Sequence, residues 1–315
     1  MGEAITVVVP VRNRPQLITR TLDSIKAQTW RPLRVIVVDN ASTDNTPATV
    51  TEWIKANVND ADPDFSCVLV EEPVTGPSNA RNRGLQEVET RLMMHFDSDD
   101  LMAPGHIEGI MRRFENPDYP DLVCFRIRYH GIDGKTITTH KPGGDMMPTH
   151  LVHSLIRTQG YACETALARR AGGWNENLQC WEDLEFGVRL LLEARKRVFI
   201  HDVNVDVLAR EDSVTGVDFS SKQGQWEKAL DAMEEDLRKG VNRNRDRWIR
   251  YVAYRRVILA AHYFREGLKK ESHLLLHKAL SLPELTKLQR LYLKLAYRYT
   301  ALGGHGASIP AKFLF

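Results

Sequence analysis

Three carboxylates stand close together at Asp97, Asp99 and Asp100, directly after the largely apolar run Leu92–Phe96. The run predicts a buried strand that delivers these acids to its carboxyl end, where open α/β sheets bind ligands. Because the acids repel one another, we expect a cation to offset their charge, and a divalent ion held by oxygen ligands is the simplest choice. Taken alone, the same residues are also typical of an acidic turn in which Asp99 or Asp100 caps the next helix.

The elements that must position these acids alternate along the first hundred residues. Short β-rich runs are separated by segments with helical periodicity. The predicted strands are 5–9, 34–38, 67–70 and 92–96, and the predicted helices are 15–28, 43–57 and 77–89. Four consecutive βα units predict a parallel sheet with both faces covered.

The regular alternation of strand and helix patterns ends after Pro104. Residues 122–129 and 136–139 flank Gly131–Gly134, which is a hairpin signal. A helix over 182–194, short strands over 197–200 and 203–208, and a charged helix over 221–239 follow. The remaining chain reads as helices over 245–266, 270–280 and 283–301.

Polar motifs follow the predicted strands. Pro10–Asn13 comes after the first strand, Asp39–Asp44 comes after the second, and Gly76–Gly84 opens the helix before the fourth. Because the carboxyl ends of parallel strands meet at one rim of a sheet, these motifs and the acids of 97–100 are expected at the same rim.

In this order the motifs resemble the nucleotide-sugar-dependent, inverting glycosyltransferases of family 2, over about residues 4–215. Their pattern is P-x-x-N, V-V-D-x-x-S-T-D, G-x-x-x-A-R-N-x-G and D-S-D-D. The resemblance implies the GT-A fold: an α/β protein with a mixed, mostly parallel sheet sandwiched by helices. We therefore expect a glycosyltransferase domain over 1–220 and a helical, basic extension over 221–315.

The resemblance also implies roles for individual residues. Asp39 corresponds to the residue that reads the donor's uracil or guanine, and Arg81 lies where a planar cation offsets the diphosphate charge. Asp97 and Asp99 are expected to bind Mg²⁺ or Mn²⁺, with Asp100 as a supporting group or a cap. The other residues expected near the donor are Pro10, Arg12, Ser98, Glu182 and Arg210.

A second acidic motif supplies the expected general base. Gly172–Glu176 followed by Trp181–Glu185 resembles the family's G-G-[FW]-[DN]-E and E-D, in which the Asp takes the acceptor's proton. Asp183 is therefore the expected catalytic residue, and Glu182 is expected to orient it or contact the donor sugar. Without the other motifs, the two acids are typical of a helix's first turn, where negative charge is favourable. Trp174 and Trp181 are candidates for sugar stacking or for core packing.

One position departs from the family pattern. Where members often place a metal-binding histidine, the stretch Leu208–Ser213 has Arg210, which cannot coordinate an ion. Two alternatives stay open: the metal is held by carboxylates and water alone, or Arg210 itself binds the diphosphate and reduces the need for metal.

Composition limits the class of protein. The 315 residues are 43% hydrophobic and 27% charged, with four widely spaced cysteines and no apolar run long enough to cross a bilayer. These features predict a cytoplasmic protein with reduced thiols. Residues 241–315 hold 15 Lys or Arg against 4 Asp or Glu, which gives this segment a net charge of +11. Because the net charge of the whole chain is +2, residues 1–240 carry a net charge of −9.

The basic segment has two interpretations. Its helices either pack on the body with a solvated basic face, or attach to the inner, anionic membrane surface where lipid-linked acceptors reside. Nucleic-acid binding is not expected, because no recognised module accompanies the charge. The resemblance implies transfer of a sugar from a nucleotide donor to a glycan or lipid-linked hydroxyl, in cell-surface polysaccharide synthesis. The rivals are a nucleotidyltransferase and an inactive sugar-nucleotide binding protein.

Overall fold

The structure is a computed structural model that describes residues 2–115, 119–208, 218–239 and 242–304. The chain divides into two compact units. The sheet unit comprises residues 1–141, 155–177 and 193–211, and the helical unit comprises 142–154, 178–192 and 212–315.

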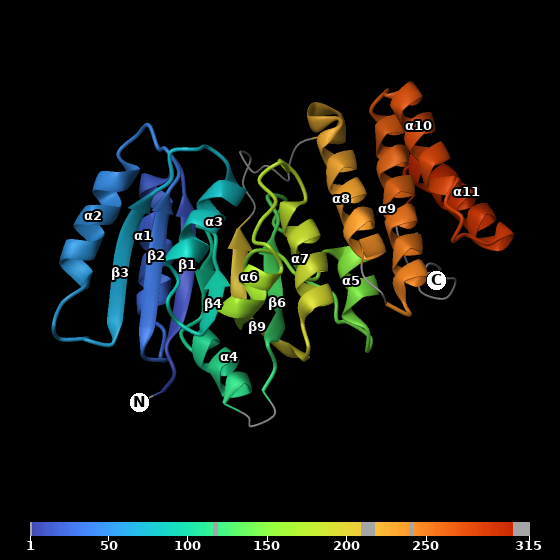
Figure 1. Cartoon of the computed structure of the whole chain (residues 1–315). Helices are drawn as coiled ribbons and strands as arrows, with labels where there is room; N and C mark the ends of the chain where they lie inside the picture. The colour runs from blue at the N-terminus through green and yellow to red at the C-terminus, as the bar shows by residue number, and fades with distance from the viewer. Residues whose placement is uncertain (1, 116–118, 209–217, 240–241, 305–315) are drawn as a thin grey trace. The chain divides into compact units, whose positions relative to one another are not determined.

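Four parallel strands form the first half of the sheet, in the order β3-β2-β1-β4 (Figure 1). They are β1 (Ile5–Val11), β2 (Leu33–Asp39), β3 (Phe65–Glu71) and β4 (Leu92–His95). In the register, Val11 lies opposite Asp39 and Val8 opposite His95. The prediction of four βα units with parallel pairing is confirmed.

The second half of the sheet is mixed. Its described strands are β5 (Leu101–Met102), β6 (Leu122–His130), β7 (Thr136–Thr138), β8 (Tyr161–Glu164) and β9 (Arg197–Leu208). β8 pairs antiparallel with both β4 and β6, and β7 completes the predicted hairpin with β6. The two strands predicted over 197–208 are one strand, β9, whose pairing with β6 is interrupted between Ile200 and Val203. The polar, exposed pair His201 and Asp202 stands at this interruption, so the sequence reads as two segments.

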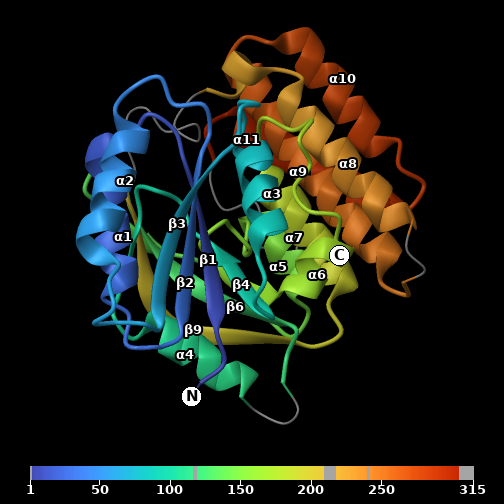
Figure 2. The same cartoon turned by 60° about the vertical axis from the view of Figure 1, so that its left-hand side comes forward.

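Helices cover both faces of this sheet (Figure 2). α1 (Pro15–Lys26), α2 (Thr46–Asn57) and α4 (His106–Phe114) share one apolar core with the strands. α3 (Pro77–Glu87) and α6 (Thr165–Arg170) lie on the opposite face (Figure 2). The β-branched residues of β1 and β2 are buried on both faces, because helices exclude water from each side.

Gly84 allows α3 to lie close to the sheet. A Cβ at this position would overlap Val8 Cγ1 and lie 3.1 Å from Val38 Cγ2. Both valines are fully buried, so neither side chain has room to withdraw. The last glycine of the G-x-x-x-A-R-N-x-G motif therefore sets the depth at which α3 packs.

Substituting Gly84→Ala is expected to lower the free energy of unfolding by about 1–3 kcal/mol, the usual cost of overpacking. Denaturant unfolding measures this change. Gly109→Ala in α4 is the matched control, because a Cβ there meets nothing within 4 Å and alanine favours a helix by roughly 0.5–1 kcal/mol over glycine. If both substitutions stabilise the protein equally, the packing argument is wrong.

The helical unit contains α5 (Met146–His153), most of α7 (Glu182–Glu193), α8 (Gln225–Lys239) and the three C-terminal helices. These last are α9 (Arg245–Arg265), α10 (Lys269–Leu280) and α11 (Lys287–Ala301) (Figure 1). α9 contacts α5, α8, α10 and α11 and is buried on most of its surface. α11 starts four residues later than predicted, because Thr286 and Gln289 form a capping box there.

No helix in the described part of the chain is both long and apolar enough to cross a membrane.

Buried histidines are expected to make stability depend on pH. Burial lowers the pKa of His95, His106 and His150 to about 3, from 6.5. Below pH 6.5 the unfolded chain binds protons that the folded chain does not, so their stabilising contribution is complete above pH 6.5 and is lost as the pH falls.

Each histidine contributes a slope of up to about 1.4 kcal/mol per pH unit below pH 6.5. Replacing His106 by Leu should therefore reduce the change in unfolding free energy between pH 7 and pH 5 by about 2 kcal/mol, because roughly 1.5 pH units of that interval lie below pH 6.5. Equal slopes in the His106 variant and the unmodified protein would contradict this expectation.

Candidate active site

The end of β2 presents a buried carboxylate. Asp39 is 5% exposed, and its Oδ2 accepts a hydrogen bond from Ser42 N at 3.1 Å. Its Oδ1 has no hydrogen-bond partner among the described residues. A buried, unsatisfied carboxylate oxygen is costly unless a ligand supplies the donor. This oxygen is therefore suited to accept an N–H from a bound base, as expected for Asp39.

Asn40 holds the neighbouring loops together. Its Oδ1 accepts from Gly76 N at 2.7 Å, and its Nδ2 donates to Val74 O at 2.7 Å. The loop after β2 is thereby tied to the loop that begins α3, so the Asp39 carboxylate and the start of α3 keep a fixed relation at one rim of the sheet.

Asp97 lies between two side-chain donors. Arg81 Nη2 donates to Asp97 Oδ1 at 3.0 Å, and Gln159 Nε2 donates to Asp97 Oδ2 at 2.7 Å. Arg81 is 5% exposed and Gln159 is 6% exposed. Because each carboxylate oxygen has its own donor, the Asp97 side chain is fixed in one orientation.

The Arg81 side chain packs against a buried cluster of aromatic rings. Its guanidinium lies 4.3 Å from the centre of the Trp174 ring, a cation–π geometry. The Trp174 ring meets His95 edge-on at 5.3 Å, and His95 Nδ1 is 2.7 Å from Tyr161 Oη. Trp174 is only 2% exposed, so of its two predicted roles the structure supports core packing.

Asp100 is buried and faces the interior. Its Oδ2 accepts from Gln159 Nε2, and its Oδ1 accepts from Leu208 N at 3.1 Å. Burial, and then the charges of Asp97 and Asp99, raise the pKa of Asp100 well above its usual value. Neither Asp99 nor Asp100 caps the next helix, because β5 follows and Gly105 is the N-cap of α4. The capping alternative is therefore wrong, and Asp100 shares the Gln159 donor with Asp97.

The remaining expected donor residues of the sheet unit lie in the same segments. Pro10 is the penultimate residue of β1 and is half-buried, and Arg12 follows the strand and is exposed. Ser98 is 7% exposed, and Asp99 is half-buried. Arg210 lies outside the described residues.

The described residues contain no group of three or more His, Cys, Asp or Glu arranged to hold a metal ion. The hard oxygen ligands of Asp97 and Asp99 nevertheless suit Mg²⁺, which typically uses one or two carboxylates and takes its other ligands from water and substrate phosphates. The pKa of Asp100 is raised first by burial and then by the charges of Asp97 and Asp99, and a cation would offset those charges. The residues present therefore fit such an ion.

The expected general base begins a helix in the helical unit. Glu182 and Asp183 form the first turn of α7, and both are half-buried. Asp183 Oδ1 accepts from Leu184 N at 2.7 Å. The negative charges are favourable at this end of the helix, and the bond limits the rotation of the Asp183 side chain.

Trp181, which precedes this turn, adopts a strained backbone conformation with φ of 53°. A bulky residue persists in the left-handed region only where its surroundings hold it. Arg255 of α9 lies 4.4 Å from the centre of the Trp181 ring, and the Trp226 ring of α8 lies at 4.9 Å. The C-terminal helices thus fix the backbone from which Glu182 and Asp183 start.

Gln159 is the functional candidate that sequence reasoning missed. It joins Asp97 to Asp100, yet it lies some sixty residues away in the chain, in an ordinary T-Q-G stretch before β8. Asn82 is a second case: its Nδ2 donates to Trp174 O at 2.9 Å and its Oδ1 accepts from Trp174 N at 2.7 Å. The Asn within the A-R-N triplet was the only signal for that bond.

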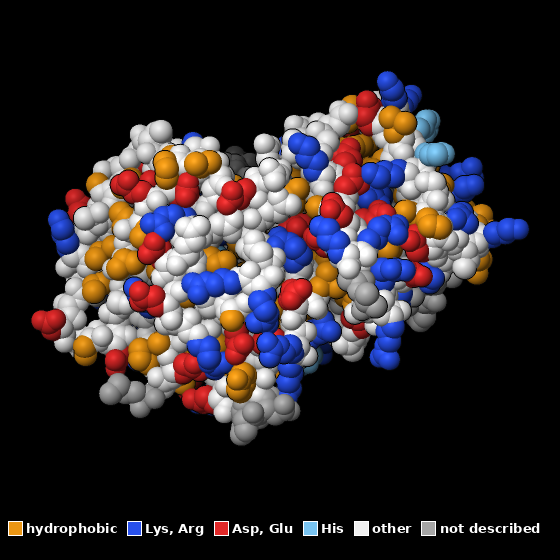
Figure 3. Space-filling model, in the orientation of Figure 1, with side chains coloured by type: hydrophobic (Ala, Val, Ile, Leu, Met, Phe, Trp, Pro, Cys, Tyr) orange, Lys and Arg blue, Asp and Glu red, His pale blue; other side chains and the backbone are white. Residues whose placement is uncertain are grey.

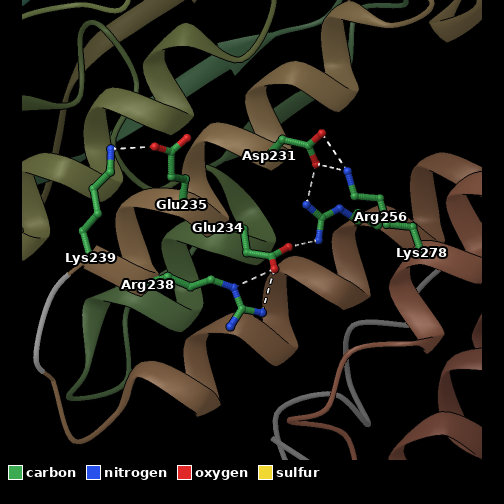
Figure 4. A pocket seen from close by; sticks show the side chains of 7 residues that line it. All are labelled: Asp231, Glu234, Glu235, Arg238, Lys239, Arg256 and Lys278. Carbon is green, nitrogen blue, oxygen red and sulfur yellow. Dashed lines mark hydrogen bonds and ion pairs between the residues drawn. The ribbon is translucent and has the colours of Figure 1, made fainter.

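A surface pocket of about 570 Å³ in the helical unit is lined entirely by charged side chains (Figure 4). Its residues are Asp231, Glu234, Glu235, Arg238, Lys239, Arg256 and Lys278. Arg256 is 1% exposed and pairs with Asp231 and Glu234, and Lys278 pairs with Asp231. Burial opposes ionisation of Glu234, but Arg256 and Arg238 outweigh it and lower its pKa. These charges satisfy one another, so the cluster joins α8, α9 and α10 and is not a second catalytic site.

The sequence of the chain matches the family described as Glycosyl transferase family 2 over residues 6–171. This is more than half of the chain, and it contains every motif of the sheet rim. The chain therefore belongs to glycosyl transferase family 2, as the resemblance predicted.

Curated relatives carry related names. A teichoic acid poly(glycerol phosphate) polymerase from Staphylococcus epidermidis is 34% identical over 62% of this chain and 27% of its own length. A pre-mycofactocin glycosyltransferase from Mycobacterium tuberculosis is 28% identical over 60% of this chain and 41% of its own. The chain thus spans less than half the length of these relatives.

Solved structures show the same fold. Residues 1–349 of TarS from S. aureus, in complex with UDP-GlcNAc, match with a TM-score of 0.68 at 17% identity, over 96% of this chain and 88% of that one. A mannosyltransferase from Pyrobaculum calidifontis in complex with GDP-Man and Mn²⁺ matches with a TM-score of 0.57 at 21% identity, over 96% and 87%. The predicted GT-A-type fold with C-terminal helices is confirmed.

Proposed function

We propose that this protein is an inverting glycosyltransferase that moves a sugar from a UDP- or GDP-linked donor to a hydroxyl of a glycan or lipid-linked acceptor. The observation that carries the proposal is the buried Asp39 Oδ1, which has no partner among the described residues, on the same sheet rim as the Arg81–Asp97–Gln159 arrangement. The first suits a nucleobase and the second a diphosphate with its counter-ion. A nucleotide donor needs both.

Each group has one task in the proposed reaction. Asp39 accepts a hydrogen bond from the base, and Arg81 offsets charge on the diphosphate. Asp183 takes the proton of the acceptor hydroxyl as its oxygen bonds to the anomeric carbon. The bond from that carbon to the diphosphate breaks, and the nucleoside diphosphate leaves with the electron pair. Attack from the face opposite the leaving group inverts the configuration.

A divalent ion, Mg²⁺ or Mn²⁺, belongs to the proposal. Asp97 and Asp99 would hold it, and when bound it supplies positive charge to the departing diphosphate. Mn²⁺ in the Pyrobaculum mannosyltransferase structure supports this choice. Arg210 is proposed as a further diphosphate contact in place of the histidine that the family often has.

The acceptor is proposed to be part of a cell-surface polymer. Two relatives support this by name: the teichoic acid polymerase, and a minor teichoic acid biosynthesis protein from Bacillus subtilis that is 22% identical. We propose that residues 1–220 carry the transfer reaction at the cytoplasmic side of the membrane. The basic helices of 221–315 would then make peripheral contact with the membrane.

Donor binding is tested by thermal stabilisation. UDP- and GDP-sugars are screened with Mn²⁺, since a ligand that binds only the folded state raises apparent stability by about 2.7 kcal/mol at 100 times its Kd. One donor class should stabilise the protein, and Asp39→Ala should abolish the shift. No shift with any nucleotide sugar would contradict the proposal.

Metal dependence is tested separately. Turnover by a sample treated with EDTA should be lost and should return on addition of Mg²⁺ or Mn²⁺. Full turnover in EDTA would end the metal proposal and favour the alternative in which arginine side chains alone offset the diphosphate.

A further inference from the structure

Helix α11 exposes a row of leucines. Leu288, Leu291, Leu295 and Leu302 have exposed fractions of 61%, 54%, 54% and 89%. Their spacing of three, four and seven residues places them on one side of the helix, and we call this row the leucine stripe. A different side of α11, which includes Leu293 and Ala296, is buried.

Positive charge accompanies the leucine stripe. Lys287, Lys294 and Arg298 are exposed and are spaced seven and four residues apart, so they form a parallel row along the same helix. Lys287–Ala301 contains no acidic residue. Blue and orange side chains accordingly lie beside one another at the edge formed by α11 (Figure 3).

Charge decides which partner suits this face. In a second copy of the chain, the same stripe would bring its own basic row, and like charges would meet around the contact. An anionic bilayer accepts apolar side chains at the boundary between headgroups and acyl chains and attracts the flanking lysines and arginines. Of these two occupants, the bilayer is the one that satisfies both the leucine stripe and the basic row.

The structure narrows the earlier interpretation of the basic segment. Sequence alone made two stretches candidates for membrane attachment, 248–258 and 291–299. In the first, Trp248, Tyr251 and Val252 are buried within α9. Only the second presents an apolar face to solvent.

We propose that the leucine stripe of α11 and its basic row dock the protein on an anionic membrane surface. This inference rests on the proposed function, because it assigns the peripheral membrane contact to one helix face. It predicts that the interaction needs both apolar insertion and positive charge.

The test is co-sedimentation of the full chain with phosphatidylcholine vesicles that contain phosphatidylglycerol, and with phosphatidylcholine vesicles alone. The protein should bind the anionic vesicles, and binding should weaken in high salt. The triple variant Leu288→Gln/Leu291→Gln/Leu295→Gln should bind at least about tenfold more weakly, because it lacks three apolar side chains whose transfer from water into the bilayer favours binding. Its control, Ile132→Gln/Ile137→Gln, removes two side chains that are 61% and 62% exposed elsewhere and should bind normally.

A second variant tests the charges. Lys294→Glu/Arg298→Glu should weaken binding at least about 25-fold, at roughly fivefold for each charge lost near an anionic surface. Lys55→Glu/Arg113→Glu, which reverses two exposed charges near the ends of α2 and α4, should have a much smaller effect. The leucine variant and the charge variant of α11 change only exposed side chains, so their melting temperatures should match that of the unmodified protein.

Three results would overturn the inference. They are equal vesicle binding by the stripe variants and their controls, equal binding to neutral and anionic vesicles, and a dimer in light scattering that the leucine variant dissociates. Release of nucleoside diphosphate from the donor is measured on the same samples. Turnover without vesicle binding would refute only the docking face, whereas vesicle binding without turnover would refute only the proposed reaction.

Discussion

Replacing Asp183 by Asn is expected to lower the rate of sugar transfer by about 10²- to 10⁴-fold, the usual contribution of a general base. Asparagine has nearly the same shape and can still accept the hydrogen bond from Leu184 N through its Oδ1, so the start of α7 is preserved. It cannot take a proton. The thermal shift given by the nucleotide sugar should therefore remain while transfer is lost.

Glu193→Gln is the matched control for this variant. Glu193 is the last residue of the same helix and is exposed, so the substitution removes one negative charge from α7 without touching its first turn. Its transfer rate should be normal. Near-normal turnover by Asp183→Asn would exclude Asp183 as the base and make the acids of α7 merely favourable helix-terminal charges.

Replacing Gln159 by Leu is expected to reduce kcat/KM by about 10²-fold or more. The amide is the donor to both Asp97 Oδ2 and Asp100 Oδ2, and a buried acceptor that loses its donor costs about 1–3 kcal/mol. Asp97 would keep only its bond from Arg81, and Asp100 only its bond from Leu208 N, so the donor would be held less firmly in one geometry. Steady-state kinetics with varied donor should show a raised KM as well as a lowered kcat.

Gln28→Leu separates this effect from a general loss of stability. Gln28 is 3% exposed, its Nε2 donates to Ala103 O at 2.8 Å, and its Oε1 accepts from Ile107 N at 3.0 Å. The two variants should be destabilised to a similar extent, but only Gln159→Leu should change the dependence on donor. Equal kinetic constants in the two variants would mean that Gln159 is only structural.

Local patterns were sufficient to predict the parallel half of the sheet. The runs at 5–9 and 35–38 are continuous β-branched segments, which is the pattern of strands buried on both faces. Helix starts were less certain, because capping depends on hydrogen bonds that the pattern does not show. Thr286 is an example: its capping box places the start of α11 after the proline-containing turn.

The mixed half of the sheet was harder to predict. β8 has only four residues and β5 only two, and both are held by pairing with strands distant in sequence. The pairing of β6 with β9 is irregular where the polar pair His201 and Asp202 interrupts β9, and this pair led to two predicted strands in place of one. Short strands whose stability comes from non-local hydrogen bonds leave little periodicity to detect.

The candidate site shows the same division between local and non-local information. Four candidate residues belong to contiguous sequence motifs and could therefore be identified from the sequence: Asp39, Arg81, Asp97 and Asp99. Gln159 could not be found in this way, because its role exists only once β8 brings it to the acids of 97–100. The burial of Trp174 beneath Arg81 is also a property of the folded sheet unit and not of the G-G-W-N-E motif.

The most direct test of the account is the phosphorus-containing product released when the protein is given its donor and a hydroxyl acceptor. Sugar transfer predicts one nucleoside diphosphate for each acceptor modified, as measured by ³¹P NMR, and a product of inverted anomeric configuration. Release of nucleoside monophosphate would indicate transfer of a phosphate-linked group, and release of pyrophosphate would indicate nucleotidyl transfer. Either of those products, or a bound donor that releases nothing, would contradict the account.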